Sequence, residues 1–385
     1  MSAESTVQLP ARLELDRDPA YEDPVTRSTL RLMLWLASAL ALAGFLVLAW
    51  RALAGGGGPD LMEVAILEQA GHFAQGQSPY AGPHSSGVAL MPVFPIVVSW
   101  LVRLFDVGVW EPRLVSLLAT LLSALLVGAI VRTETKSATF GATAAGLLLM
   151  SQGIANSDAA FARPEVLMLM LAIVGCQVLR FTSGFLGAML ASLFFSAACF
   201  THPAGLAFAL AALFHLRAFD PRRMIAYALG LAVLVCTAQA QFSQVLGPDF
   251  NLVAWSTGIE SVRFEPIPLL QFVGTQLLGT LGVFTLATVL SFALPIPPWR
   301  GAVGIWTWMA FAALAAGVVS TQGTGASGEA MRATATILAI AGPVSAQRVT
   351  QHLSNWPGGS RMGGQSVVLT ALALQFVTLF ASGAS

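Results

Sequence analysis

The chain has 385 residues, of which 56% are hydrophobic and only 10% are charged, and its formal net charge is zero. Its mean hydropathy of +0.75 excludes an ordinary soluble domain, because a single core could not bury so much apolar surface. The balanced charge also provides no basic surface for nucleic acid, so we expect no nucleic-acid partner. The composition predicts an integral membrane protein that crosses the bilayer several times.

The N-terminal tail, residues 1–29, is polar and rich in carboxylates. A secretory signal would begin with basic residues and turn apolar much sooner. We therefore expect a cytoplasmic tail that precedes a retained membrane span. The N-terminus is accordingly placed on the cytoplasmic side.

Apolar runs of the length needed to cross a bilayer recur along the rest of the chain. They predict an all-α, polytopic helical bundle of about 11 transmembrane helices. The spans are expected near residues 30–50, 113–132, 138–154, 164–181, 184–200, 203–217, 223–243, 268–294, 301–320, 332–348 and 366–382.

The segment 88–106 is apolar, but it must begin and end on the outer side if the span at 113–132 runs inward. We therefore predict an interfacial or re-entrant helix in the first outer loop, residues 54–112. Pro92 and Pro95 are expected to break its hydrogen-bond ladder, and Trp100 suits the headgroup level.

Lysine and arginine indicate the orientation of the bundle. Most of the 19 Lys and Arg residues fall in segments that lie inside when the N-terminus is cytoplasmic. Four outer segments then emerge on one face, so residues far apart in sequence are expected to converge on one cavity. These segments are the Gly55–Pro95 loop, the Asn156–Glu165 connection, the turn Thr201-His202-Pro203 and the 244–266 loop.

The first outer loop concentrates the residues that could carry chemistry. Asp60 and Glu63 stand three residues apart at a predicted helix start, on one face near the amino end, which favours anions. His72, His84 and Glu68 are weak candidates for a divalent metal, because no tight ligand spacing links them. We expect no metal and no cofactor.

The order of several segments resembles a known family. These are PDLMEVAILEQA, GQSPY, MPVFPIVVSWLVRLF and EPRLVSLLAT, followed by ARPEVLMLMLAIVG and CFTHPAGLAFALAAL. Over roughly residues 30–220 the chain is similar to the GT-C superfamily of multi-spanning glycosyltransferases. The branch is the one with protein mannosyltransferases, lipid A aminoarabinose transferases and bacterial RgtA/B/C/D-like enzymes.

The resemblance implies a transferase in the bacterial inner membrane. It would pass a sugar from a polyprenyl-phosphate donor, a membrane lipid, to a glycan, lipid or protein acceptor at the outer, periplasmic face. The family's base is an acidic residue of the first outer loop, which corresponds here to Asp60, with Glu63 second. The alternatives are that Asp60 is only a helix cap and that Glu63 and Glu68 form a solvated helix face.

Further candidates for binding the substrate or the donor phosphate lie at the outer ends of spans or in the first outer loop: Arg113, Arg163, Glu165, His202 and Tyr80. The guanidinium of Arg163 matches phosphate oxygens, although it could equally snorkel or pair with Asp158. Glu165 stands where the family has Asp. The family often has Lys at the position of His202, whose charge depends on its pKa and which could be an ordinary hydrogen-bonded residue. The ring of Tyr80 could line a substrate groove or simply mark the interface.

The resemblance divides the chain into a catalytic membrane module at 30–220 and C-terminal transmembrane helices at 221–385, and we expect no soluble C-terminal domain. A catalytically lapsed membrane subunit or scaffold is an alternative function, since the departures at Glu165 and His202 are also what loss of activity would produce. A lipid or solute transporter fits less well, because charges inside the predicted spans are scarce.

Overall fold

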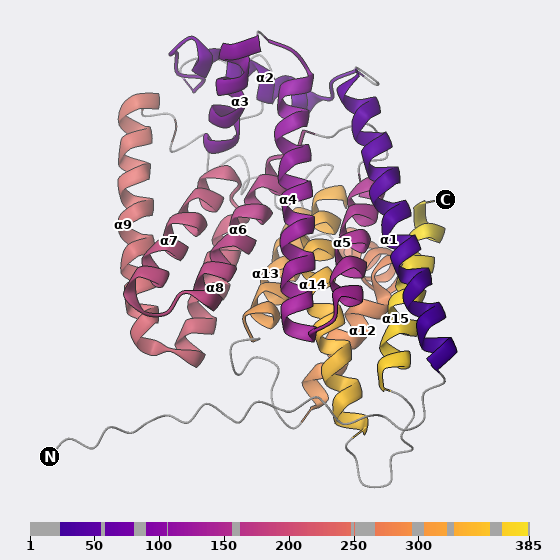
Figure 1. The fold of residues 1–385 in the computed structure, drawn as a ribbon. Coiled ribbons are helices and arrows are strands. Elements are labelled where there is room, and N and C mark those ends of the chain that lie inside the picture. Colours follow the sequence, from indigo (N-terminus) through magenta and orange to yellow (C-terminus); the bar gives the residue numbers. More distant parts are fainter. Residues whose placement is uncertain are drawn as a thin grey trace, which may run out of the picture.

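The computed structural model describes residues 24–54, 58–80, 90–105, 107–155, 162–247, 250, 266–294, 304–321, 327–354 and 364–383. Every regular element in these ranges is a helix, which confirms the predicted all-α bundle (Figure 1). The helices are α1 (Pro24–Leu53), α2 (Leu61–Ala74), α3 (Val93–Phe105), α4 (Trp110–Thr135), α5 (Ala138–Ala155), α6 (Pro164–Phe181), α7 (Gly184–Thr201), α8 (Gly205–Phe219), α9 (Pro221–Leu246), α11 (Pro266–Gln271), η1 (Phe272–Thr280), α12 (Gly282–Leu290), η2 (Ser291–Ala293), α13 (Gly304–Thr321), α14 (Ser327–Ser354) and α15 (Gly364–Gly383).

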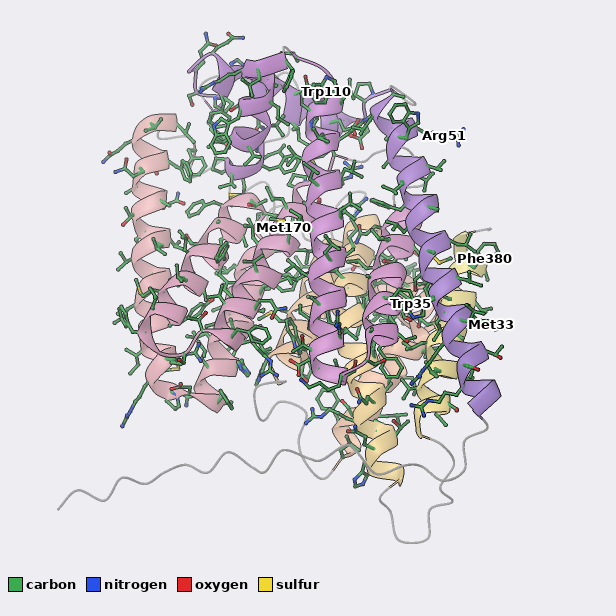
Figure 2. All side chains as sticks on the ribbon, viewed as in Figure 1. Met33, Trp35, Arg51, Trp110, Met170 and Phe380 are labelled. Carbon is green, nitrogen blue, oxygen red and sulfur yellow. The ribbon has the colours of Figure 1, made fainter. Side chains whose placement is uncertain are left out.

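Length and composition make six of the described helices able to cross a membrane, and one bent pair would make a seventh. Large apolar side chains such as Leu40, Leu125 and Phe380 are exposed on the outside of the bundle. Phe380 and Met33 point outward from neighbouring helices in Figure 2. So wide an apolar surface suits a lipid environment, and the chain is an integral membrane protein.

The predicted span at 268–294 is sharply bent in the structure. The π-helical segment η1 and the following α12 meet at an angle of 91°. Gln375 of α15 satisfies backbone groups at the break. Its side-chain NH₂ donates to the carbonyl of Thr280 (2.6 Å), and its oxygen accepts the N–H of Phe284 (3.2 Å). Irregular backbone is tolerated at membrane depth where protein groups replace the lost hydrogen bonds.

Helices α2 and α3 lie across one end of the bundle, where they form what we call the α2–α3 cap (Figure 1). The apolar face of α3, with Phe94, Val98 and Val102, packs with Ile66 of α2. A helix forms within the predicted segment 88–106, but the expected break at Pro95 is wrong. Pro95 lies in the first turn of α3, where its missing N–H has no partner within the helix to lose.

The opposite end of the bundle is fastened by arginines. Arg180 of α6 donates through Nε and Nη2 to the two carboxylate oxygens of Glu134 of α4, at 2.6 and 2.9 Å. Arg223 of α9 donates to the carbonyls of Leu179 and Thr182, each at 2.8 Å, where α6 ends. The arginines that the positive-inside rule assigns to the cytoplasm therefore lie away from the cap.

Candidate active site

Asp60 caps α2 and faces an arginine from a distant part of the chain. Its Oδ1 accepts the N–H of Glu63 (2.8 Å), a typical helix N-cap. Its Oδ2 lies 2.5 Å from Nη2 of Arg163. The Asp60 side chain is 35% exposed and that of Arg163 is 15% exposed. The pair is therefore anchored by protein groups and still reachable from outside.

The backbone of Arg163 is held on both sides by one hydroxyl of α4. The N–H of Arg163 donates to Oγ of Ser116 (2.9 Å), and that hydroxyl lies 3.2 Å from the carbonyl oxygen of Arg163. Arg163 is extended and precedes Pro164, which begins α6. This arrangement fixes the point from which the guanidinium reaches Asp60.

Glu63 and Arg113 form a buried ion pair beneath the cap, with side chains 0% and 1% exposed. Nε and Nη2 of Arg113 donate to the two carboxylate oxygens at 3.0 and 2.7 Å. Arg113 Nη1 also donates to the carbonyl of Ala52 (2.8 Å), and Glu63 Oε1 accepts the N–H of Ala162 (3.2 Å). The pair therefore joins the ends of α1 and α4 to α2 and to the residue before Arg163.

This burial separates the two carboxylates that the sequence places together. Both oxygens of Glu63 accept hydrogen bonds from protein donors and are closed to solvent, so Glu63 helps to hold the cap in place. Its role as second candidate base stays a prediction. Arg113 is equally closed off in this structure, and its contact with the donor phosphate stays a prediction. Asp60 is the one of the two carboxylates that a substrate could reach.

Glu165 and His202 face each other at the ends of α6 and α7. Nε2 of His202 lies 3.9 Å from Oε1 of Glu165, longer than a hydrogen bond. Nδ1 of His202 accepts the N–H of Ala204 (3.2 Å), which assigns the ring proton of neutral His202 to Nε2. Burial lowers the pKa of His202, and the nearby Glu165 carboxylate opposes that shift only in part. His202 is therefore neutral at neutral pH.

Tyr80 lies inside the packing between the cap and α9. Its hydroxyl donates to the carbonyl of Leu90 (2.5 Å), its ring meets Phe250 edge to face at 5.1 Å, and only 1% of the residue is exposed. Ser78 adds a hydrogen bond to the carbonyl of Leu246 (2.5 Å). Tyr80 thus helps to fasten the cap to α9, and its contact with a substrate stays a prediction.

The weak metal candidates do not meet in the part of the chain that the structure describes. His72 Nδ1 lies 3.2 Å from Gln77 Oε1 on the exposed side of α2, and no group of three His, Cys, Asp or Glu residues suited to a metal occurs there. His84, Asp158 and most of the 244–266 loop fall outside the described residues.

Segments that are distant in sequence meet at the cap end, as predicted from the topology. Asp60 pairs with Arg163 across 103 positions, and Ala162 reaches Glu63 across 99. His202, which follows the last residue of α7, faces Glu165 in the first turn of α6. Figure 1 shows the start of α4 and the end of α1 at this end of the bundle.

No family model matches the sequence, and no curated protein matches it either. Among solved structures, it is similar to ArnT from Cupriavidus metallidurans in the apo state, with a TM-score of 0.51 and 14% identity. It is also similar to the same protein bound to undecaprenyl phosphate, with a TM-score of 0.52 and 14% identity. Each match covers 90% of this chain and 76% of ArnT.

The chain has the GT-C fold. The order of the sequence segments indicated a resemblance to this superfamily, and the shared fold confirms that resemblance at the level of fold.

Sequence reasoning did not identify Ser116 as a site residue, although it lies in the quoted segment EPRLVSLLAT. Arg113 and Ser116 are three residues apart, so they share one face of α4. That spacing was the available signal, because a hydroxyl and a guanidinium on one face of a membrane helix must both find partners inside the protein.

Proposed function

We propose that this GT-C chain is a membrane glycosyltransferase that moves a sugar from a polyprenyl-phosphate donor to an acceptor hydroxyl at the α2–α3 cap. The observation that most supports this proposal is the solvent-accessible ion pair of Asp60 and Arg163 at one end of an apolar helical bundle. The likeness to ArnT bound to undecaprenyl phosphate supports a polyprenyl phosphate as the lipid carrier. The positive-inside rule supports a cap on the periplasmic side of the inner membrane.

In the proposed reaction, the acceptor oxygen attacks the anomeric carbon of the sugar as the bond from that carbon to the phosphate oxygen breaks. An Asp60 oxygen accepts the proton of the acceptor hydroxyl, and the phosphate leaves with the bonding electron pair. Arg163 stabilises the charge that develops on the phosphate. Its guanidinium has five N–H donors, so it can contact Asp60 and phosphate oxygens together.

Glu165 and His202 are proposed to bind the sugar. His202 is neutral and carries its proton on Nε2, so it can donate a hydrogen bond but adds no positive charge at the phosphate. Nε2 of His202 and Oε1 of Glu165 lie 3.9 Å apart, so a sugar hydroxyl bound beside them would be close to both side chains. His202 therefore differs in role from the lysine that the family often has there.

The proposal is tested by mass spectrometry of glycolipids and glycoproteins from cells with and without the gene. We expect one glycoconjugate to lose a sugar and the lipid-linked sugar to accumulate when the gene is absent. Identical profiles would contradict a transferase. Restoration of the wild-type profile by the Asp60→Asn protein would favour the lapsed-subunit alternative, because a scaffold does not need the base.

Replacing Arg163 is predicted to weaken use of the lipid donor. The Arg163→Gln protein loses charge-assisted hydrogen bonds to phosphate, so its KM for the donor should rise by roughly 10- to 100-fold. Arg180→Gln is a matched control, since Arg180 also pairs with a carboxylate but lies at the opposite end. Steady-state kinetics in nanodiscs measure both, and an unchanged KM for Arg163→Gln would remove the residue from the donor site.

Acidification is predicted to destabilise the fold through His202. Because its pKa is lower in the folded protein, the unfolded chain binds more protons as the pH falls below about 6.5, the ordinary histidine pKa. Stability is therefore lost as the pH drops from 6.5 toward the folded pKa. When the pH is lowered from 7.5 to 5.5, the melting temperature of the His202→Asn protein should fall by less than that of wild type. Equal losses would show that His202 does not titrate in this way.

A further inference from the structure

The hydroxyl of Ser116 makes hydrogen bonds outside its own helix. It accepts the N–H of Arg163 (2.9 Å) and donates to the carbonyl of the same residue (3.2 Å). Other hydroxyls of α4 behave differently. Thr120 donates to the carbonyl of Ser116 (2.9 Å) and Thr135 to that of Val131 (2.6 Å), which is the usual choice of a hydroxyl inside a helix. Ser116 therefore serves a distant segment of the chain, and we call its contact with Arg163 the Ser116 clamp.

Two consecutive backbone N–H groups, at Ala162 and Arg163, are fixed from α4. Arg163 precedes Pro164 and has the extended backbone (φ −135°, ψ 117°) that a residue before proline prefers. It stands before the first turn of α6, so its N–H has no acceptor within that helix. The N–H of Ala162 donates to Glu63 (3.2 Å), which Arg113 of α4 holds in turn. One N–H is thus fixed by α4 directly, and the other through Glu63.

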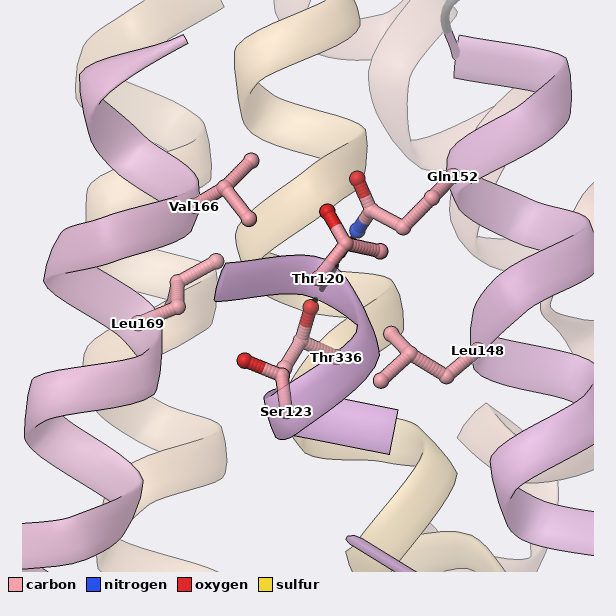
Figure 3. A pocket seen from close by; sticks show the side chains of 7 residues that line it. All are labelled: Thr120, Ser123, Leu148, Gln152, Val166, Leu169 and Thr336. Carbon is pink, nitrogen blue, oxygen red and sulfur yellow. Dashed lines mark hydrogen bonds between the residues drawn. The ribbon is translucent and has the colours of Figure 1, made fainter. Parts of the chain in front are cut away.

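Helices α4 and α6 also pack together just below the Ser116 clamp. Figure 3 shows Thr120 of α4 and Val166 and Leu169 of α6 lining one small pocket. Thr120 follows Ser116 by four residues and Val166 follows Arg163 by three, so this packing lies about one helical turn deeper. Ser116 itself is only 2% exposed, so a substrate does not reach it. The clamp therefore belongs to the packed bundle, and only the side chain of Arg163 extends from it toward Asp60.

We propose that Ser116 is a positioning residue that raises the affinity for the donor phosphate through Arg163. The inference rests on the proposed function, in which the Arg163 guanidinium contacts that phosphate. Arginine has a long side chain with many rotamers, so its donors meet a ligand well only when the backbone starts from a fixed point. Because Ser116 fixes that point, less ordering is needed when the phosphate binds. A hydroxyl suits this role, since it donates and accepts at once.

Replacing Ser116 is predicted to weaken use of the donor. In the Ser116→Ala protein the Arg163 N–H loses its acceptor, so the KM for the lipid donor should rise by roughly 3- to 10-fold. Ser116→Thr keeps the hydroxyl and should stay within about twofold of wild type. Ser151→Ala is the matched control, because Ser151 is also 2% exposed but donates to the carbonyl of Leu148 in its own helix (2.8 Å). If steady-state kinetics in nanodiscs gave Ser116→Ala a KM no higher than that of Ser151→Ala, the inference would be overturned.

A double-mutant cycle shows whether Ser116 acts through Arg163. In an Arg163→Gln background, Ser116→Ala should raise the KM by less than about twofold, because the guanidinium that it positions is gone. An equal rise in both backgrounds would give Ser116 a general structural role and overturn the inference. The wild-type protein tests the proposed function separately, since a wild type that transfers no sugar contradicts the transferase whatever Ser116 does.

Hydrogen–deuterium exchange tests the Ser116 clamp itself and needs no sugar transfer. The Arg163 N–H should exchange several-fold faster in Ser116→Ala than in wild type, because it loses its acceptor and lies outside the hydrogen-bond ladder of α6. Ser151→Ala should leave this rate unchanged. Mass spectrometry with electron-transfer fragmentation resolves the single amide. Equal exchange at Arg163 in wild type and Ser116→Ala would overturn the clamp even in an active transferase.

Discussion

The Asp60→Asn protein is expected to transfer sugar at least about 100-fold more slowly than wild type, because a positioned general base contributes roughly 10²- to 10⁴-fold to rate. Asparagine caps a helix about as well as aspartate, so α2 should still begin at Leu61. The loss would therefore reflect the missing proton acceptor and the missing charge beside Arg163. Release of polyprenyl phosphate from a lipid-linked sugar in nanodiscs measures the rate.

A second helix cap provides the control for this prediction. Asp220 caps α9 through the N–H of Arg223 (3.2 Å), at the end of the bundle away from the α2–α3 cap. Asp220→Asn should leave transfer within about twofold of wild type, because it makes the same change in capping chemistry and touches no substrate. If the Asp60→Asn protein turned over as fast as the Asp220→Asn protein, Asp60 would be only a helix cap and not the base.

Removal of Glu63 is predicted to give the largest loss of stability. Glu63→Ala leaves Arg113 as a buried charge without its carboxylate and deprives the Ala162 N–H of its acceptor. Breaking a fully buried ion pair in this way costs about 3–5 kcal/mol. Unfolding in detergent, followed by tryptophan fluorescence, measures the change in the free energy of unfolding.

Two comparisons make the interpretation of Glu63→Ala specific. Glu134→Ala should cost less, because its partner Arg180 is 20% exposed and can be hydrated when the carboxylate is lost. Replacing both partners, Glu63→Leu with Arg113→Met, should recover part of the loss, since no buried charge is left unpaired. A cost for Glu63→Ala no larger than that for Glu134→Ala would contradict the assignment of this pair as the anchor of the cap.

The bundle itself was predictable because the length of an apolar run decides whether a helix crosses a bilayer. The predicted spans at 113–132 and 164–181 lie within α4 and α6. The break between η1 and α12 was not predictable from its own segment. It depends on Gln375, which lies 91 positions beyond Phe284 and supplies the hydrogen bonds that the bent backbone loses.

The contact between Asp60 and Arg163 was predictable, whereas the burial of Glu63, Arg113 and Tyr80 was not. Charges at span ends that face one side indicated that Asp60 and Arg163 would meet. The sequence could not show which of two carboxylates three residues apart is buried. Packing of the cap against α4 decides that, since it turns Glu63 toward Arg113 and leaves Asp60 at the helix start.

Hydroxyls inside the spans illustrate a second limit of sequence reasoning. Ser123 and Ser151 both stand in apolar helices and both are buried. One has no partner among the described residues, and the other bonds its own backbone. Sequence alone does not distinguish them, because the choice depends on how the neighbouring helices pack around each hydroxyl.

A cryo-electron microscopy structure of the protein in nanodiscs with undecaprenyl phosphate tests the proposed site most directly. We expect the lipid phosphate at the cap end, within about 4 Å of the Arg163 guanidinium, with Asp60 beside it. Glu63 should still be paired with Arg113 beneath the cap. A phosphate bound at the Glu134 and Arg180 end, or separated from Asp60 by packed helices, would contradict the proposed transferase site.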